Sequence, residues 1–139
     1  MIILDTNVVS ELMRRSPAPV VLAWLRRRTG SELFTTAITA AEVRYGIARL
    51  PDGHRKDDLV RAANEVFTAF PDQVLPFDDA AASAYADLVA QRERLGNPID
   101  GFDGQIAAIC HSHGGLLATR NVKDFHHTGI ATTDPWQDG

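Results

Sequence analysis

The chain has 139 residues, of which 45% are hydrophobic and 23% charged, so it is long enough for one domain, residues 1–139, with a core of its own. Its formal net charge of −4 argues against nucleic-acid binding driven by overall charge, and its single cysteine, Cys110, excludes an internal disulfide and fits a reducing cytoplasm. The first apolar run, residues 1–4, is too short for a signal peptide or a membrane span.

Short apolar runs alternate with helical apolar periodicities along the chain. Strands are expected at residues 2–4, 33–36, 73–75, 116–119 and 130–132. Helices are expected from Asn7 as N-cap to about Met13, over 20–25, from Thr39 as N-cap to Leu50, over 59–70, from Asp78 to Leu95, and from Asp100 as N-cap to about His113. This alternation favours an α/β fold in which helices cover both faces of a central parallel sheet.

Asp5 follows directly on the first expected strand. Burying a carboxylate is costly unless a cation, a hydrogen-bond donor or water compensates it. In α/β sheets the crevice beyond the carboxyl ends of the strands is also where ligands bind. Asp5 therefore predicts a charged site at this edge of the sheet, with helix capping, in competition with Asn7, as the alternative.

Three further acidic residues stand at comparable places. Glu42 and Asp103 are each expected in the first turn of a helix, and Asp124 just past a late strand. Carboxylates are the hard oxygen ligands that Mg²⁺ takes in proteins, and a bound metal can activate water for attack on a phosphate. The structural alternative is that Glu42 completes a capping box with Thr39 and that Asp103 bonds back to Asp100.

Four segments, in order along the chain, resemble the motifs of PIN-domain nucleases. They are Leu4-Asp5-Thr6-Asn7, Ile38-Thr39-Ala40-Ala41-Glu42 with Gly46 after it, Asp103-Gly104-Gln105-Ile106-Ala107-Ala108, and Leu117 to Phe125 with its Thr-Arg-Asn-x-x-Asp-Phe pattern. Each motif is weak alone, but the ordered set covers nearly the whole chain. Within the family, the sequence is most similar to VapC-type toxins of bacterial toxin–antitoxin pairs.

The resemblance implies a three-layer α/β/α domain and a metal-dependent endoribonuclease. Its Mg²⁺ or Mn²⁺ would bind Asp5 and Asp103, with Glu42 helping directly or through water. The catalytic set would be Asp5, Glu42, Asp103 and Asp124, although Asn121 occupies the other candidate position for the fourth residue.

Polar residues beside these acids suggest supporting roles. The hydroxyl of Thr6 and the amide of Asn7 can orient Asp5 or a bound water. Thr119 and Arg120 follow a strand and can meet a phosphate, for which arginine offers a bidentate fork. A surface ion pair is the alternative interpretation of Arg120.

The function predicted on this basis is hydrolysis of RNA phosphodiesters, as the toxin of a toxin–antitoxin pair. Water would attack phosphorus in line and leave 5′-phosphate and 3′-hydroxyl ends. The alternative is a non-catalytic PIN-like module that only engages its antitoxin. A haloacid-dehalogenase-type phosphatase is disfavoured because Asn7 stands where that chemistry needs a second aspartate.

The expected partners are RNA and a cognate antitoxin protein, with no membrane. The helices around 20–25 and 43–50 carry apolar residues, including Trp24 and Tyr45, beyond the needs of one sheet face. They predict a homodimer or larger toxin–antitoxin assembly with a groove for an antitoxin segment, whose arginine would block the acidic pocket. Cys110 is interpreted as core filler, and His126 and His127 as a surface pair.

Overall fold

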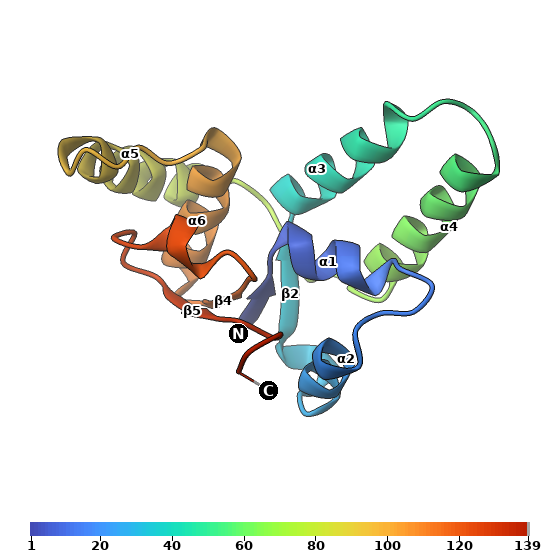
Figure 1. Ribbon diagram of the computed structural model, residues 1–139. Coiled ribbons are helices and arrows are strands. Elements are labelled where there is room, and N and C mark those ends of the chain that lie inside the picture. Colours follow the sequence, from blue (N-terminus) through green and yellow to red (C-terminus); the bar gives the residue numbers. More distant parts are fainter. Residues whose placement is uncertain (139) are drawn as a thin grey trace.

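The structure, a computed structural model, describes residues 1–138 and is built around a parallel sheet (Figure 1). The strands are β1 (Ile2–Leu4), β2 (Leu33–Thr36), β3 (Val74–Leu75), β4 (Leu116–Ala118) and β5 (Ala131–Thr133). Their spatial order is β3-β2-β1-β4-β5, and every neighbouring pair runs parallel. The expected central parallel sheet is confirmed, with the first strand of the chain in its middle.

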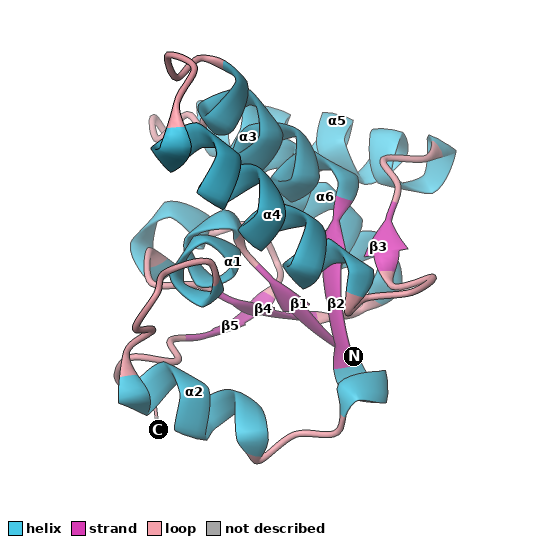
Figure 2. Cartoon of the chain, turned by 90° about the vertical axis from the view of Figure 1, so that its right-hand side faces the viewer, coloured by secondary structure: helices cyan, strands magenta, loops and turns pink. Residues whose placement is uncertain are grey.

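Helices cover both faces of this sheet, which confirms the three-layer α/β/α architecture. They are α1 (Thr6–Leu12), α2 (Pro19–Arg26), α3 (Ala37–Ala48), α4 (His54–Thr68), α5 (Asp79–Arg94) and α6 (Gly101–His113), with short 3₁₀ turns η1 (Gly30–Glu32) and η2 (Val122–Phe125). In Figures 1 and 2, α5 and α6 lie on one side of the sheet and α1 to α4 on the other. No helix within residues 1–138 is both long and apolar enough to cross a membrane.

The two faces of β1 supply two separate cores. Ile3 points to the core that contains α5 and α6, whereas Ile2 and Leu4 point to the core that contains α1 to α4. Side chains alternate in this way along any strand, and full burial of one such side chain contributes about 1.5–3 kcal/mol. Packing on both faces therefore fixes the strand, and it also fixes the backbone of Asp5, which directly follows the strand.

Asn7 is not the N-cap of the first helix, contrary to the prediction. Helix α1 begins at Thr6, and Asp5 is its N-cap, with Oδ1 accepting a hydrogen bond of 2.8 Å from the backbone N–H of Thr6. The helix begins here because Asp5 is the single residue between β1 and α1, and its extended backbone and side-chain acceptor cap the first turn. This leaves the amide of Asn7 free to bond elsewhere.

Thr39 is likewise not an N-cap. Helix α3 begins at Ala37, and Thr36, the last residue of β2, caps it by accepting a hydrogen bond of 3.0 Å from the N–H of Thr39. Glu42 consequently lies in the second turn of α3, so the expected capping box between Thr39 and Glu42 does not exist. The predicted N-cap Asp100 of α6 is confirmed, and Asp78, where a helix was expected to start, is the N-cap of α5.

Trp24 does not contribute to an exposed apolar surface, as its place in the partner prediction required. Its side chain is fully buried in the core under α1 to α4, whereas Tyr45 is 66% exposed. Cys110 is fully buried beside α5 and β4, which confirms its interpretation as core filler. Burial raises the pKa of its thiol to about 12, so the thiol stays protonated. His126 and His127 are exposed, as expected of a surface pair.

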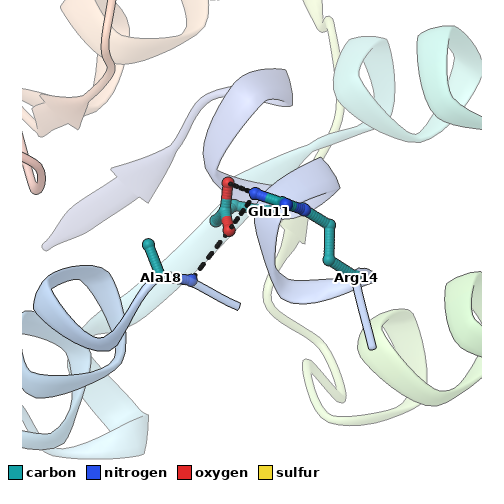
Figure 3. A network of polar contacts seen from close by, with 3 residues as sticks. All are labelled: Glu11, Arg14 and Ala18. Carbon is teal, nitrogen blue, oxygen red and sulfur yellow. Dashed lines mark hydrogen bonds and ion pairs between the residues drawn. The ribbon is translucent and has the colours of Figure 1, made fainter. Parts of the chain in front are cut away.

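Glu11 ties the end of α1 to the segment that leads into α2 (Figure 3). Its buried carboxylate accepts a hydrogen bond of 2.8 Å from the backbone N–H of Ala18 and forms an ion pair of 3.1 Å with Nη1 of Arg14. The N–H of Ala18 belongs to the residue just before α2, so this bond sets where the second helix starts. The same carboxylate fixes the direction of the Arg14 guanidinium.

We expect Glu11→Ala to lower the free energy of unfolding by about 2 kcal/mol, because it leaves a partly buried N–H and an arginine without their acceptor. Glu11→Gln keeps an oxygen that can accept from Ala18, so its loss should be smaller. Urea unfolding followed by circular dichroism measures both values. Equal losses in the two variants would show that the charge, rather than the hydrogen bond to Ala18, supplies the stabilisation.

Candidate active site

The candidate site lies where the chain order of the sheet reverses. From β1 the chain proceeds to β2 and then β3 on one side, and it returns to place β4 against the other side of β1. Such a switch point opens a crevice beyond the carboxyl ends of the two strands. Asp5 directly follows β1 and Thr119 directly follows β4, and the N–H of Asp5 bonds to the carbonyl of Ala118 at 2.9 Å.

Asp5 is a buried carboxylate that neutral hydrogen-bond donors, rather than a lysine or an arginine, hold in place. Its side chain accepts from Oγ1 of Thr119 at 2.7 Å and from the N–H of Thr6 at 2.8 Å, and Nδ2 of Asn7 stands 3.5 Å away. None of the ion pairs within residues 1–138 involves Asp5. Burial raises the pKa of Asp5 despite these donors, and the like charge of Asp124 adds to the shift.

Asn7 connects the start of α1 to the turn that follows β4. Its Nδ2 donates to Oγ1 of Thr119 at 3.2 Å, and its Oδ1 accepts from the N–H of Arg120 at 3.1 Å. Oγ1 of Thr119 also accepts from the N–H of Asn121 at 3.0 Å, so its one proton remains for Asp5. The amide of Asn7 thus fixes the hydroxyl that orients the Asp5 carboxylate.

Glu42 reaches the same region from α3. Its carboxylate accepts a hydrogen bond of 2.9 Å from Oγ1 of Thr6, which lies 3.1 Å from Oγ1 of Thr39. Burial raises the pKa of Glu42 against the opposing effect of the Thr6 hydrogen bond, and the charges of Asp5 and Asp100 raise it further. Thr6 therefore contacts two of the four acidic residues, Asp5 through its backbone and Glu42 through its side chain.

Asp103 projects from the first turn of α6, and its pKa is strongly raised. Burial, followed by the negative charges of neighbouring carboxylates, raises its pKa from 3.8 to about 7. Those neighbours are Asp5, Asp100, Asp124 and Glu42. The hydrogen bonds of residues 1–138 include none to the Asp103 carboxylate, so it does not bond back to Asp100 as the capping alternative required.

Asp124 and Asn121 both lie in the exposed segment after β4. The residue that holds this segment is Arg92, which was not predicted from the sequence. Arg92, buried in α5, donates hydrogen bonds of 2.9 Å to the backbone carbonyls of Asp124 and His126. The signal that could have found it is an arginine within the apolar stripe that includes Leu88 and Leu95. A charged group at such a position usually has a specific buried partner.

Neighbouring carboxylates add to the raised pKa values of Asp5, Glu42 and Asp103, yet the acids are not close enough to form a ready-made cage. In the part of the chain that the structure describes, no three His, Cys, Asp or Glu side chains are placed to hold one metal ion. Mg²⁺ usually takes only one or two carboxylates, keeps several waters and uses substrate phosphates as further ligands. The uncompensated acids at this edge therefore fit a hydrated divalent cation, although they do not enclose one.

The pKa of Asp103 predicts how the site affects stability in the absence of metal. Because the folded-state pKa, about 7, lies above the unfolded value of 3.8, the folded state binds more protons between these values and loses stability as pH rises through this window. We expect Asp103→Asn to raise the melting temperature at pH 8 in EDTA and to flatten the decline between about pH 4 and 7. Thermal melts across pH measure both effects.

Asp87→Asn is a matched control for this experiment, because it removes one exposed carboxylate from α5, outside the site. It should leave the pH profile of the melting temperature nearly unchanged. A lower melting temperature for Asp103→Asn at pH 8 would show that Asp103 stabilises the start of α6 and that its neighbours do not repel it.

Comparison with known proteins is consistent with this geometry. A family model described as PIN domain matches residues 2–130. The chain is 43% identical over 138 residues to VapC ribonuclease Y4jK of Sinorhizobium fredii, covering 99% of each chain, and 37% identical over 139 residues to Toxin FitB of Neisseria gonorrhoeae, covering 99% of this chain and 100% of that one.

A solved structure, FitAB bound to an IR36 DNA fragment, contains a chain that superimposes with a TM-score of 0.91 at 36% identity, covering 100% of this chain and 98% of that one. A second, FitAcB from Neisseria gonorrhoeae, gives a TM-score of 0.90 at 37% identity, with 99% of each chain covered. The matched family model and these relatives together show that the chain belongs to the PIN domain family.

Proposed function

We propose that the protein is a metal-dependent endoribonuclease and the toxin of a toxin–antitoxin pair. The observation that carries this proposal is the group of mutually repelling carboxylates at the switch point of the sheet, around Asp5 and Asp103. A site with excess negative charge has no evident purpose in a protein that binds RNA phosphates, unless a cation joins the two. The relatives named as ribonucleases and toxins support the same activity.

Asp5 and Asp103 would hold Mg²⁺ or Mn²⁺, with Glu42 as a further ligand directly or through water. The metal would supply positive charge at the scissile phosphate and at the departing 3′-oxygen. The hydroxyl of Thr119 and the N–H of Thr6 hold the Asp5 carboxylate in one orientation. Binding of a cation would therefore cost little side-chain entropy at Asp5.

Glu42 or Asp124 would orient the attacking water and accept its proton. The raised pKa of Glu42 makes it a stronger base than an ordinary glutamate, and its hydrogen bond from Thr6 sets its direction. In-line attack by water leaves a 5′-phosphate and a 3′-hydroxyl, because the 2′-hydroxyl of the RNA takes no part.

Arg120 is suited to contact the RNA backbone beside this site. Its exposed guanidinium lies 4.7 Å from the ring centre of Trp136, while its backbone N–H is fixed to Asn7. This arrangement limits the positions of the side chain but leaves its hydrogen-bond donors for a phosphate. No ion pair within residues 1–138 uses Arg120, in contrast to the surface-pair alternative.

The partner of this chain would be a cognate antitoxin, within a homodimer or a larger assembly. Support comes from Toxin FitB and from the solved structure of FitAB bound to DNA. Buried Trp24 cannot take part, so the contact surface would use exposed residues such as Tyr45. An antitoxin arginine placed among the carboxylates would neutralise them and exclude both metal and substrate. The alternative function, a non-catalytic module that binds only its antitoxin, would use the clustered acids for that arginine alone and predicts no metal-dependent cleavage of RNA.

We expect Asp5→Asn and Asp103→Asn each to reduce RNA cleavage by at least about 100-fold in Mg²⁺ or Mn²⁺, because each removes a charge that would hold the metal. Asp87→Asn should cleave at the normal rate. The assay follows a labelled RNA and identifies 5′-phosphate ends, and circular dichroism checks that each variant is folded. A folded Asp5→Asn or Asp103→Asn protein with full activity would remove that residue from the mechanism.

The fourth acidic position can be assigned by comparing Asp124→Asn with Asn121→Ala. We expect the loss of cleavage with Asp124→Asn, because the charge of Asp124 acts on both Asp5 and Asp103. Asn121 contacts the site through its backbone N–H, which the alanine variant keeps. Cleavage rates at saturating metal measure both variants, and a reversed order of the two losses would assign the position to Asn121.

A further inference from the structure

A second cavity, with a basic lining, lies between the end of α1 and the start of α4. It has a volume of about 720 Å³, and three arginines and one histidine line it: Arg14, Arg15, His54 and Arg55. Among the described residues that line it, Asp58 is the one carboxylate. In a chain with a net charge of −4, this local excess of cations stands out from the rest of the sequence. We refer to it as the basic cavity.

Beside the basic cavity lies a cavity of about 320 Å³ that reaches the acidic site. Thr6 and Glu42 line this smaller cavity, and it shares Met13, Arg14, Arg55 and Leu59 with the basic cavity. Arg14 and Arg55 therefore line both cavities, between the Glu42 carboxylate and the other arginines. A ligand that crosses the acidic site on this side enters the basic cavity next.

The arginines retain most of their hydrogen-bond donors. Arg14 uses only Nη1 on Glu11, and the hydrogen bonds of residues 1–138 give its Nε and Nη2 no partner. Arg55 has no ion pair or side-chain hydrogen bond within the same residues. Nη2 of Arg15 lies 3.5 Å from Oδ2 of Asp58, and the Arg15 side chain is 95% exposed. Asp58 also forms an ion pair with Arg61. Such exposed pairs are weak and exchange readily for a phosphate.

Glu11 holds the side chain of Arg14 in place. Its carboxylate is buried, accepts from the N–H of Ala18, and holds Nη1 of Arg14, as Figure 3 shows. The Arg14 guanidinium is thus anchored on one edge while its other edge remains open. An anchored arginine loses less conformational entropy on binding a ligand than a mobile one.

We propose that the basic cavity binds the phosphates of the RNA strand next to the bond being cut, with Arg14, Arg15 and Arg55 as their ligands. This inference rests on the proposed function, and it adds the direction in which the strand leaves the acidic site. A nucleic-acid strand carries one negative charge per nucleotide, which matches a row of arginines beginning at the site. The acidic site repels those same phosphates, so binding requires cations beside it.

The test measures binding of a fluorescein-labelled, mixed-sequence, single-stranded 20-nucleotide RNA in EDTA, where no cleavage occurs. The variant is Arg15→Gln with Arg55→Gln, which leaves the Glu11–Arg14 pair intact. The control is Arg26→Gln with Arg27→Gln, which removes the same charge from the end of α2, whose residues line neither cavity. Fluorescence anisotropy gives Kd at several NaCl concentrations, and circular dichroism confirms folding.

We expect the Arg15 and Arg55 variant to raise Kd at least about 10-fold at 0.1 M NaCl and to reduce the slope of log Kd against log salt by about 0.7 for each phosphate that is no longer neutralised. The α2 control should change Kd less than about twofold. If the double variant is unfolded, Arg55→Gln alone is measured against Arg27→Gln with the same expectations.

Equal effects of the two variants on Kd and on the salt slope would overturn the inference. Unchanged RNA binding together with weaker binding of the cognate antitoxin would also overturn it, and would assign the basic cavity to a protein partner. Cleavage is assayed separately in Mn²⁺. An unmodified protein that binds RNA without cutting it would contradict the proposed function, while the binding data would still decide the role of the cavity.

Discussion

The repulsion among four carboxylates at one edge of the sheet is the constraint on which the other features of the site depend. At Asp103 this repulsion adds to the larger effect of burial, and together they raise its pKa to about 7. A fold that places such groups together without a cation gives up stability at neutral pH. The donors around Asp5 reduce this cost, and they do so with hydroxyl and backbone groups rather than with lysine or arginine. The site therefore keeps its negative charge.

The topology explains how residues so distant in sequence meet. β1 and β4 are neighbours in the sheet, although most of the chain separates them, and each ends in a residue of the site. Hydrophobic contacts on both faces fix β1, and a hydrogen bond from Thr119 then fixes Asp5. Packing thus sets the position of the carboxylate, and the polar contacts set only its orientation. The arginines beyond α1 extend the same edge with the opposite charge.

The sheet and its helices could be predicted from the sequence because they depend on local patterns. Asp5 directly follows an apolar run that predicts a strand, and Asp100 directly precedes a segment that predicts a helix. The sequence therefore locates the ends of these two elements to within a few residues. Thr36 was missed as a cap because a strand that passes directly into a helix offers several adjacent threonines, and only the tertiary path selects one. Arg92 was missed because all its partners are backbone carbonyls, and those of Asp124 and His126 lie more than 30 residues away, so they leave no trace in the pattern of side chains.

Arg92 has a consequence for the dynamics of the site. Its guanidinium bonds to the carbonyls of Asn97, Asp124 and His126, and so joins the loop before α6 to the turn that carries Asp124. Breaking one of these bonds leaves a buried charge less satisfied, so the two segments open together or not at all. We therefore expect them to behave as one cooperative unit in local unfolding. Hydrogen exchange in the loop near Asn97 therefore reports on the order of an acidic residue that is remote from it in sequence.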